Sequence, residues 1–266
     1  MIIMMDILLF GTVILYFAAS VLQFAAVSFK KDGVRRVSWI VFLIGLAAHT
    51  AYLIARGVIA HRLPLSNQFE FACAFAWGVG VLLVVLGMHY KAPWMAVAAM
   101  PMAFLILSYA VLQPREVTEL MPALRSAWFG LHIGTAVFSY SSFMLAGATG
   151  IRYLFMERSG SADEAKLRRM DHLSYRLVAL GLFLLTVTIL SGAIWAEQAW
   201  SSFWTWDPKE VWALITWILY AVYLHLRLRK GHSGRAMAWY VIIAVPVVLF
   251  TFAGVNTLLH GLHSYG

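Results

Sequence analysis

Two long apolar runs constrain this chain most, because their length matches the thickness of a lipid bilayer. Residues 71–88 and 92–112 contain no Asp, Glu, Lys or Arg. A run of about 18 apolar residues is long enough to cross the hydrocarbon core as an α-helix. In lipid only helices and closed barrels satisfy every backbone hydrogen bond, and runs of this length favour helices. The composition agrees, since only 12% of the residues are charged, against about 25% in a typical soluble domain.

The whole pattern predicts an all-α integral membrane protein with about eight transmembrane helices in a single membrane domain, residues 1–266. We expect the spans at approximately 7–29, 38–57, 69–88, 92–112, 126–152, 176–196, 208–227 and 236–259. The longest connection, from Glu157 to Asp171, is expected to be a charged loop.

The basic residues predict the orientation of these spans. Five Lys and Arg residues fall on one set of connections: Arg56, Arg62, Arg115, Arg125 and Lys209. Fifteen fall on the other set: Lys30, Lys31, Arg35, Arg36, Lys91, Arg152, Arg158, Lys166, Arg168, Arg169, Arg176, Arg227, Arg229, Lys230 and Arg235. The positive-inside rule assigns the richer set to the cytoplasmic side. Eight spans then put both termini on the outer side, together with the connections 58–68, 113–125 and 197–207.

The distribution of charge argues against a nucleic-acid partner, and the cysteine count excludes an internal disulfide. A net charge of +8 can indicate a nucleic-acid partner. Here the basic residues lie between spans rather than on one face, so we expect no nucleic acid. The single cysteine, Cys73, lies inside an apolar run, so no internal disulfide can form.

The most unusual segment, residues 195–217, reads WAEQAWSSFWTWDPKEVWALITW. It contains six tryptophans: Trp195, Trp200, Trp204, Trp206, Trp212 and Trp217. We expect Trp195 to end the sixth span, the next three to lie in the outer connection, and the last two to lie in the seventh span. An aromatic belt at the membrane interface explains two or three tryptophans, but not six. A dense aromatic surface suits a large flat ligand, because rings offer stacking area at low entropic cost.

The tetrapeptide 207–210 predicts a sharp helix start. Asp207 suits the N-cap, Pro208 the first helical position, and Glu210 the third position of a capping box. Capping alone is a sufficient explanation for Asp207 and Glu210.

Two histidines are expected beside the tryptophan-rich connection. His132 lies inside the outer end of the fifth span, and His263 lies just beyond the last span. Histidines from two helices can approach haem iron from opposite faces, and a polar residue in a span is a functional hypothesis by default. The alternative for each is a structural hydrogen bond between helices, and His260 competes with His263 for its role.

Other histidines lie elsewhere. His225 lies near the inner end of the seventh span and cannot share the outer site; His49 lies inside the second span. Each could bind haem within the membrane or form a hydrogen bond between helices. Four more are interpreted as surface residues: His61, His89, His172 and His232.

With these residues in view, the stretch 192–227 resembles the WWD signature of haem-handling membrane proteins. It is most similar to the CcsA/ResC type of system II cytochrome c biogenesis. The likeness continues through Leu63-Pro64-Leu65-Ser66-Asn67 to Glu70, through 126–143 and 171–176, and to the terminus GLHSYG. The tryptophan-rich outer loop of the signature corresponds to residues 195–211. One departure is Ser201-Ser202, where the family pattern has glycine.

The resemblance implies a site and a cofactor, haem b. It makes His132 and His263 the outer axial ligands of the haem iron. It makes His225 a membrane ligand completed by a histidine of a partner protein. It also places cofactor-binding residues in the loop: Trp195, Trp200, Trp204, Trp206 and Asp207. No catalytic residue separate from the haem site is expected.

The resemblance also implies an activity and partners. Haem would move to the outer face and be presented to apocytochrome c, whose CxxCH cysteines form thioethers with it. The implied partners are a CcsB/ResB-type membrane protein, the apocytochrome and a thioredoxin-like thiol reductant. The implied location is the bacterial cytoplasmic membrane or a thylakoid membrane. Two alternatives stay open: a haem delivery subunit without ligase activity, and a haem-free regulatory member of the same superfamily.

Overall fold

The computed structural model describes residues 2–90, 92–117, 119, 121, 124–160 and 163–259. Within these ranges the chain is helical and has no strand, and eight helices are long and apolar enough to cross a membrane. The predicted all-α membrane fold with eight spans is therefore confirmed. The chain divides into two compact units, Met1–Pro122 and Ala123–Gly266. Each is described by itself.

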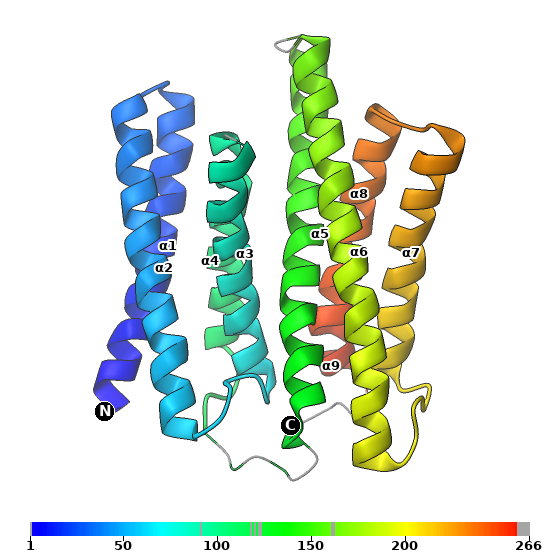
Figure 1. The fold of residues 1–266 in the computed structure, drawn as a ribbon. Helices are drawn as coiled ribbons and strands as arrows, with labels where there is room; N and C mark the ends of the chain where they lie inside the picture. The colour runs from blue at the N-terminus through cyan, green and yellow to red at the C-terminus, as the bar shows by residue number, and fades with distance from the viewer. Residues whose placement is uncertain are drawn as a thin grey trace. The chain divides into compact units, whose positions relative to one another are not determined.

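Unit 1 consists of two helical pairs (Figure 1). Its elements are α1 (Ile2–Ser28), α2 (Asp32–Ala60), α3 (Gln68–Tyr90), the short 3-10 helix η1 (Pro93–Met95) and α4 (Ala96–Val111). Helix α1 packs along α2 and α4, and α3 packs along α4.

A buried contact joins α1 to α2 at their middle. The ring of Tyr16 stacks on Phe42 with centroids 5.1 Å apart, and its hydroxyl lies 3.2 Å from Nδ1 of His49. Gly45 lets the helices approach, because a Cβ there would lie 3.0 Å from the Tyr16 ring. His49 is fully buried. Its contact with the Tyr16 hydroxyl is a hydrogen bond between two helices, which is the structural role expected as one alternative for His49.

Unit 2 carries the longest helices (Figure 1). Its elements are α5 (Ala127–Ser159), α6 (Glu164–Trp200), α7 (Pro208–Lys230), α8 (Arg235–Leu249), the π-helix η3 (Phe250–Gly254) and α9 (Val255–Leu258). Helix α5 lies between α6 and α8, and α7 packs against α6 and α8.

Small residues bring α5 close to both neighbours. A Cβ at Gly150 would lie 2.7 Å from the carbonyl oxygen of Ala238 on α8. On the other side, the hydroxyl of Ser139 donates to the carbonyl of Gly181 on α6 over 2.8 Å. Close backbone approach and hydroxyl bonds of this kind are how helices associate in lipid, where burial of apolar surface supplies little force.

The outward face of α1 shows what surrounds the unit. Large exposed apolar side chains recur every three or four residues along the helix: Ile3, Ile7, Phe10, Ile14, Phe17, Val21 and Phe24. Such a stripe would be costly in water, so it indicates a lipid-facing surface.

Two helices of unit 2 extend further than expected. Helix α5 continues to Ser159 and α6 begins at Glu164, so the predicted charged loop from Glu157 to Asp171 is wrong for most of its length. The side chain of Asp163 accepts a hydrogen bond from the Lys166 amide over 2.7 Å and starts α6. At its other end α6 includes Trp200, which we expected in the connection.

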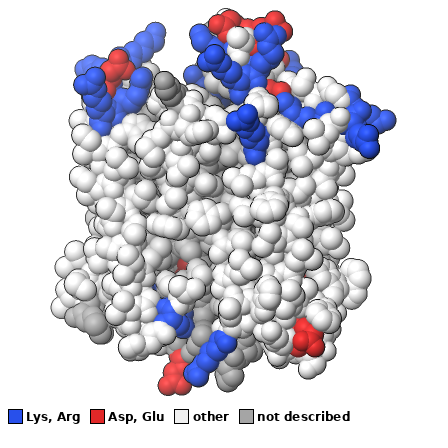
Figure 2. All heavy atoms as spheres, viewed as in Figure 1, with Lys and Arg blue, Asp and Glu red and all other residues white. Residues whose placement is uncertain are grey.

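Lys and Arg gather at one end of each unit (Figure 2). In unit 1 this end carries the α1–α2 connection, and in unit 2 it carries the α5–α6 and α7–α8 connections. The distribution is the one from which the orientation was predicted, and the orientation itself stays a prediction.

Candidate functional site

His132 is the sixth residue of α5, and its imidazole packs against α6. The helix begins after Ser126, whose hydroxyl accepts from the Trp128 amide over 3.2 Å. Nδ1 of His132 lies 2.8 Å from the carbonyl oxygen of Thr188. A carbonyl oxygen only accepts hydrogen bonds, so Nδ1 carries the proton. In the neutral imidazole, Nε2 then carries the lone pair that a metal ion requires.

The indole of Trp195 lies beside this histidine. Its ring lies 6.1 Å from the His132 ring at an interplanar angle of 24°. Phe129 and Trp200 contact the same indole, with centroids at 5.2 Å and 4.8 Å. Trp195 is only 1% exposed. The structure thus brings His132, Trp195 and Trp200 together, and Trp195 belongs to the helix packing rather than to an open stacking surface.

The connection from α6 to α7 holds two other tryptophans. Trp204 and Trp206 meet edge to face at 5.8 Å, and Trp206 is 69% exposed. Ser201 ends α6 in the left-handed conformation with φ of 56°, which favours glycine. The expectation of a glycine in this loop therefore has a physical explanation at position 201, where serine adopts the left-handed conformation.

The predicted capping box at the start of α7 is confirmed. The side chain of Asp207 accepts from the Lys209 amide over 3.0 Å, and the Glu210 carboxylate accepts from the Asp207 amide over 3.2 Å. Glu210 also accepts from the Thr205 amide over 2.8 Å. Glu210 therefore fixes the end of the tryptophan-rich connection to the first turn of α7.

The start of α7 is also tied to the end of the described chain. Nζ of Lys209 donates to the side-chain oxygen of Asn256 over 3.0 Å, and Trp212 packs on Phe250 at 4.3 Å. The last described residue is Leu259. The predicted ligand His263 and its competitor His260 lie outside the described residues.

His225 does not join this site. It follows Pro208 by 17 residues along α7, a separation of about 25 Å at 1.5 Å per residue. Its side chain is exposed. His225 thus lies near the opposite end of α7 from the tryptophan-rich connection.

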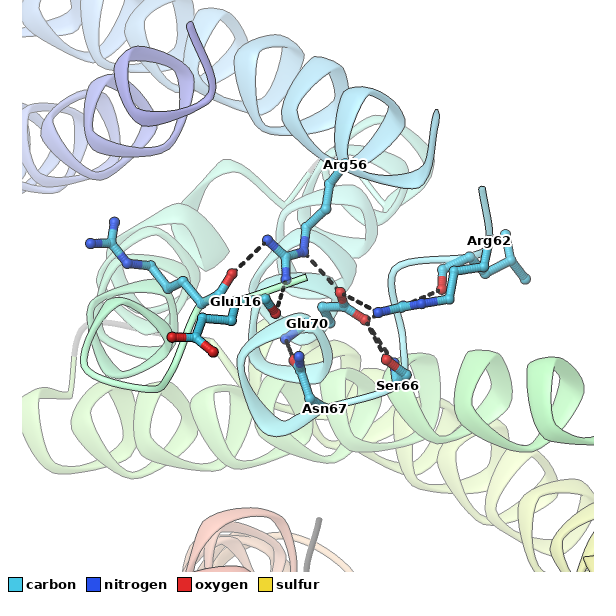
Figure 3. A network of polar contacts seen from close by, with 8 residues as sticks. Arg56, Arg62, Ser66, Asn67, Glu70 and Glu116 are labelled. Carbon is cyan, nitrogen blue, oxygen red and sulfur yellow. Dashed lines mark hydrogen bonds and ion pairs between the residues drawn. The ribbon is translucent and has the colours of Figure 1, made fainter. Parts of the chain in front are cut away.

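A buried charge cluster lies in unit 1, around the carboxylate of Glu70 (Figure 3). Nε of Arg56 donates to Oε1 over 2.9 Å, and Nη1 of Arg62 donates to Oε2 over 2.7 Å. Oε2 also accepts from the backbone amide of Ser66 over 2.8 Å, and the Glu70 amide donates to Oδ1 of Asn67 over 2.8 Å. Glu70 is 0% exposed.

The same cluster holds the segment after α4. The two terminal nitrogens of Arg56 donate to the carbonyl oxygens of Arg115 and Glu116 over 3.1 and 3.3 Å (Figure 3). Sequence reasoning counted Arg56 and Arg62 only as basic residues of connections. An acidic residue at the start of an apolar run was the available signal, because a buried carboxylate requires cationic partners.

Comparison with known proteins places these features in a family. Residues 65–263 match the family of cytochrome C assembly proteins. A cytochrome c biogenesis protein CcsA of Synechococcus sp. (strain RCC307) is 36% identical, over 86% of this chain and 85% of the relative. The CcsA proteins of Prochlorococcus marinus (strain MIT 9301) and Parasynechococcus marenigrum (strain WH8102) are 34% and 33% identical, over 90% and 97% of this chain and 87% and 94% of the relatives. The chain therefore belongs to the cytochrome c assembly protein family and is a cytochrome c biogenesis protein of the CcsA type.

Proposed function

We propose that this chain holds haem b at its outer face, with His132 as one axial ligand and His263 as the other, and presents it to apocytochrome c. One observation carries the proposal. A backbone carbonyl holds His132 in the tautomer that ligates through Nε2, and the histidine lies against Trp195, a few residues before the tryptophan-rich connection.

The residues fit such a ligand by their chemistry. Neutral imidazole is a common axial ligand of haem iron, and aromatic side chains suit a large flat macrocycle. Trp200, Trp204 and Trp206 are proposed to contact the haem. Asp207 is proposed to act beside it as the cap that starts α7, which its hydrogen bond to Lys209 supports.

Haem is the substrate here, and it supplies the vinyl groups. In the attachment step a cysteine thiol of the CxxCH motif adds across a vinyl group. The sulfur–carbon bond forms, the vinyl double bond becomes single, and the thiol hydrogen goes to the other vinyl carbon. The chain's own residues hold and orient the substrate, so catalysis is positioning. Reduced cysteines are needed, which is the role proposed for a thioredoxin-like reductant.

A second, inner haem contact is proposed at His225. Its side chain is exposed on α7, so a histidine of a CcsB/ResB-type partner could reach the opposite face of the same iron. The chain would then receive haem at His225 and pass it to the outer site. The cyanobacterial relatives fit either a cytoplasmic or a thylakoid membrane.

The experiment is spectroscopic. The chain is purified with its partner in detergent, and oxidised and dithionite-reduced spectra are compared for the wild type, His132→Gly, His263→Gly and His232→Gly. The last is the control, because His232 is exposed in the α7–α8 connection. We expect a bis-histidine b-type spectrum that weakens in the first two variants and returns with imidazole. If the spectrum is the same in the wild type, His132→Gly and His263→Gly, the ligand assignment is wrong.

Co-expression with the partner and an apocytochrome separates the classes of activity. Covalent haem on the apocytochrome supports a synthase subunit. Haem bound to the chain without covalent product indicates a delivery subunit, and a colourless protein indicates a haem-free role.

A further inference from the structure

We propose that Thr188 and Gly192, one turn apart on α6, form a slot that positions His132 for ligation through Nε2. The inference rests on the proposed function, because it concerns how the proposed axial ligand is held. Neither residue contacts the substrate in this proposal, so both are positioning residues.

Gly192 provides the space. A Cβ built at Gly192 would lie 2.5 Å from Nδ1 of His132 and 2.7 Å from its Cε1, and its third neighbour, Cγ at 3.5 Å, belongs to the same ring. Carbon atoms in proteins do not approach ring atoms this closely without displacement. The imidazole therefore occupies the place that any larger residue at 192 would fill.

The backbone carbonyl of Thr188 orients the imidazole of His132. Its carbonyl oxygen accepts from Nδ1 over 2.8 Å, which fixes both the ring plane and the tautomer. The Thr188 hydroxyl lies 2.8 Å from the Thr135 hydroxyl, so α5 and α6 are joined again one turn from the histidine. A hydrogen bond from Nδ1 to a carbonyl also raises the basicity of Nε2 toward a metal ion.

The slot predicts that Gly192→Ala weakens haem binding, a result that helix stability alone does not predict. Alanine is a better helix former than glycine, so Gly192→Ala does not weaken α6 by itself. Its methyl group displaces the imidazole and breaks the bond to Thr188. Gly134→Ala is the matched control, because a Cβ there meets nothing within 4 Å. Residue 134 also lies about 200° around α5 from residue 132.

The test measures haem retained per protein and the reduced spectrum for the wild type, His132→Gly, Gly192→Ala and Gly134→Ala, each with the partner. We expect Gly192→Ala to weaken haem binding about 10- to 100-fold, and Gly134→Ala to match the wild type. The midpoint potential of the haem left in Gly192→Ala should rise, because the more basic ligand is lost. Thr188→Val should retain haem, because the carbonyl rather than the hydroxyl accepts from Nδ1.

Two outcomes separate this inference from the function on which it rests. If His132→Gly leaves the spectrum unchanged, the proposed function fails. If His132→Gly loses the ligand but Gly192→Ala behaves like Gly134→Ala, the slot is wrong and the ligand assignment stands.

A double variant covers the case in which Gly192→Ala accumulates poorly. Removing the ring removes the clash, so the variant with both His132→Gly and Gly192→Ala should accumulate like His132→Gly alone. Continued poor accumulation of the double variant would place the clash elsewhere and overturn the inference.

Discussion

Lys209 donates a hydrogen bond to the side-chain oxygen of Asn256 over 3.0 Å, which joins the first turn of α7 to α9. The tryptophan-rich connection ends just before Lys209, and Asn256 lies in the short helix that leads toward His263. The bond therefore couples the two parts of the chain to which the sequence assigns the outer site.

Asn256→Leu tests this coupling. The Lys209 ammonium would lose a partly buried acceptor, and a hydrogen bond to a charged group contributes about 1.5–3 kcal/mol to stability. We expect a lower unfolding temperature in detergent and a fall in bound haem that imidazole restores. Thr257→Val is the control, since the Thr257 hydroxyl donates only to carbonyls of its own helical segment. Wild-type stability and haem content in Asn256→Leu would show that the bond does not hold the site.

Glu70→Gln should be strongly destabilising. The change leaves Arg56 and Arg62 buried with no carboxylate between them. Breaking a buried ion pair from one side costs about 3–5 kcal/mol. Thermal unfolding in detergent measures the loss. Glu116→Gln is the matched control, because Arg56 contacts the backbone carbonyl of Glu116, which the change preserves. Equal unfolding temperatures of the two variants would contradict the role given to Glu70.

Two substitutions separate the capping role of Asp207 from a contact with the ligand. Asp207→Ala removes the cap and should cost about 1 kcal/mol. Asp207→Ser retains capping ability, so we expect it to preserve both the unfolding temperature and the haem content. If serine restores stability but not haem, the Asp207 carboxylate also contacts the ligand.

Ser201→Gly should be neutral or stabilising. A side chain in the left-handed region costs roughly 1–2 kcal/mol, and glycine removes that cost while losing about 0.5–1 kcal/mol to the unfolded chain. Ser202→Gly is the comparison and should be destabilising, because the Ser202 hydroxyl donates to the carbonyl of Trp204 over 3.1 Å. The unfolding temperatures of the two variants check the order, and a reversed order would refute it.

His225→Gly should act only in the complex. The side chain is exposed on this chain, so the isolated protein should unfold only slightly below the wild-type temperature, by the amount that a glycine inside a helix costs. With the partner present, we expect a loss of the inner haem contact, seen as lower haem content that imidazole restores. An identical haem content with and without the change, in the presence of the partner, would exclude His225 as a ligand.

Local sequence patterns predicted the parts of the fold that depend on nearby residues. Eight spans follow from apolar length, and the start of α7 follows from the capping residues Asp207, Pro208 and Glu210. The boundary between α5 and α6 was not predicted. Residues 157–171 are charged, and helices can project beyond the bilayer without being apolar.

The candidate site was predicted only in part. His132 was identified from its position in a span near the tryptophan-rich segment, but its partners Thr188 and Gly192 lie 56 and 60 residues further along the chain. Which turn of α6 faces His132 depends on how two helices pack, and no local pattern encodes that.

The sequence by itself determined that this protein crosses a membrane, where α7 begins, and which family it belongs to, because apolar length, caps and motifs are local properties. Only the tertiary structure decided which nitrogen of His132 carries the proton, how Glu70 is neutralised, and that Trp195 packs inside while Trp206 is exposed. These features depend on contacts between distant residues, which exist only after the helices have packed.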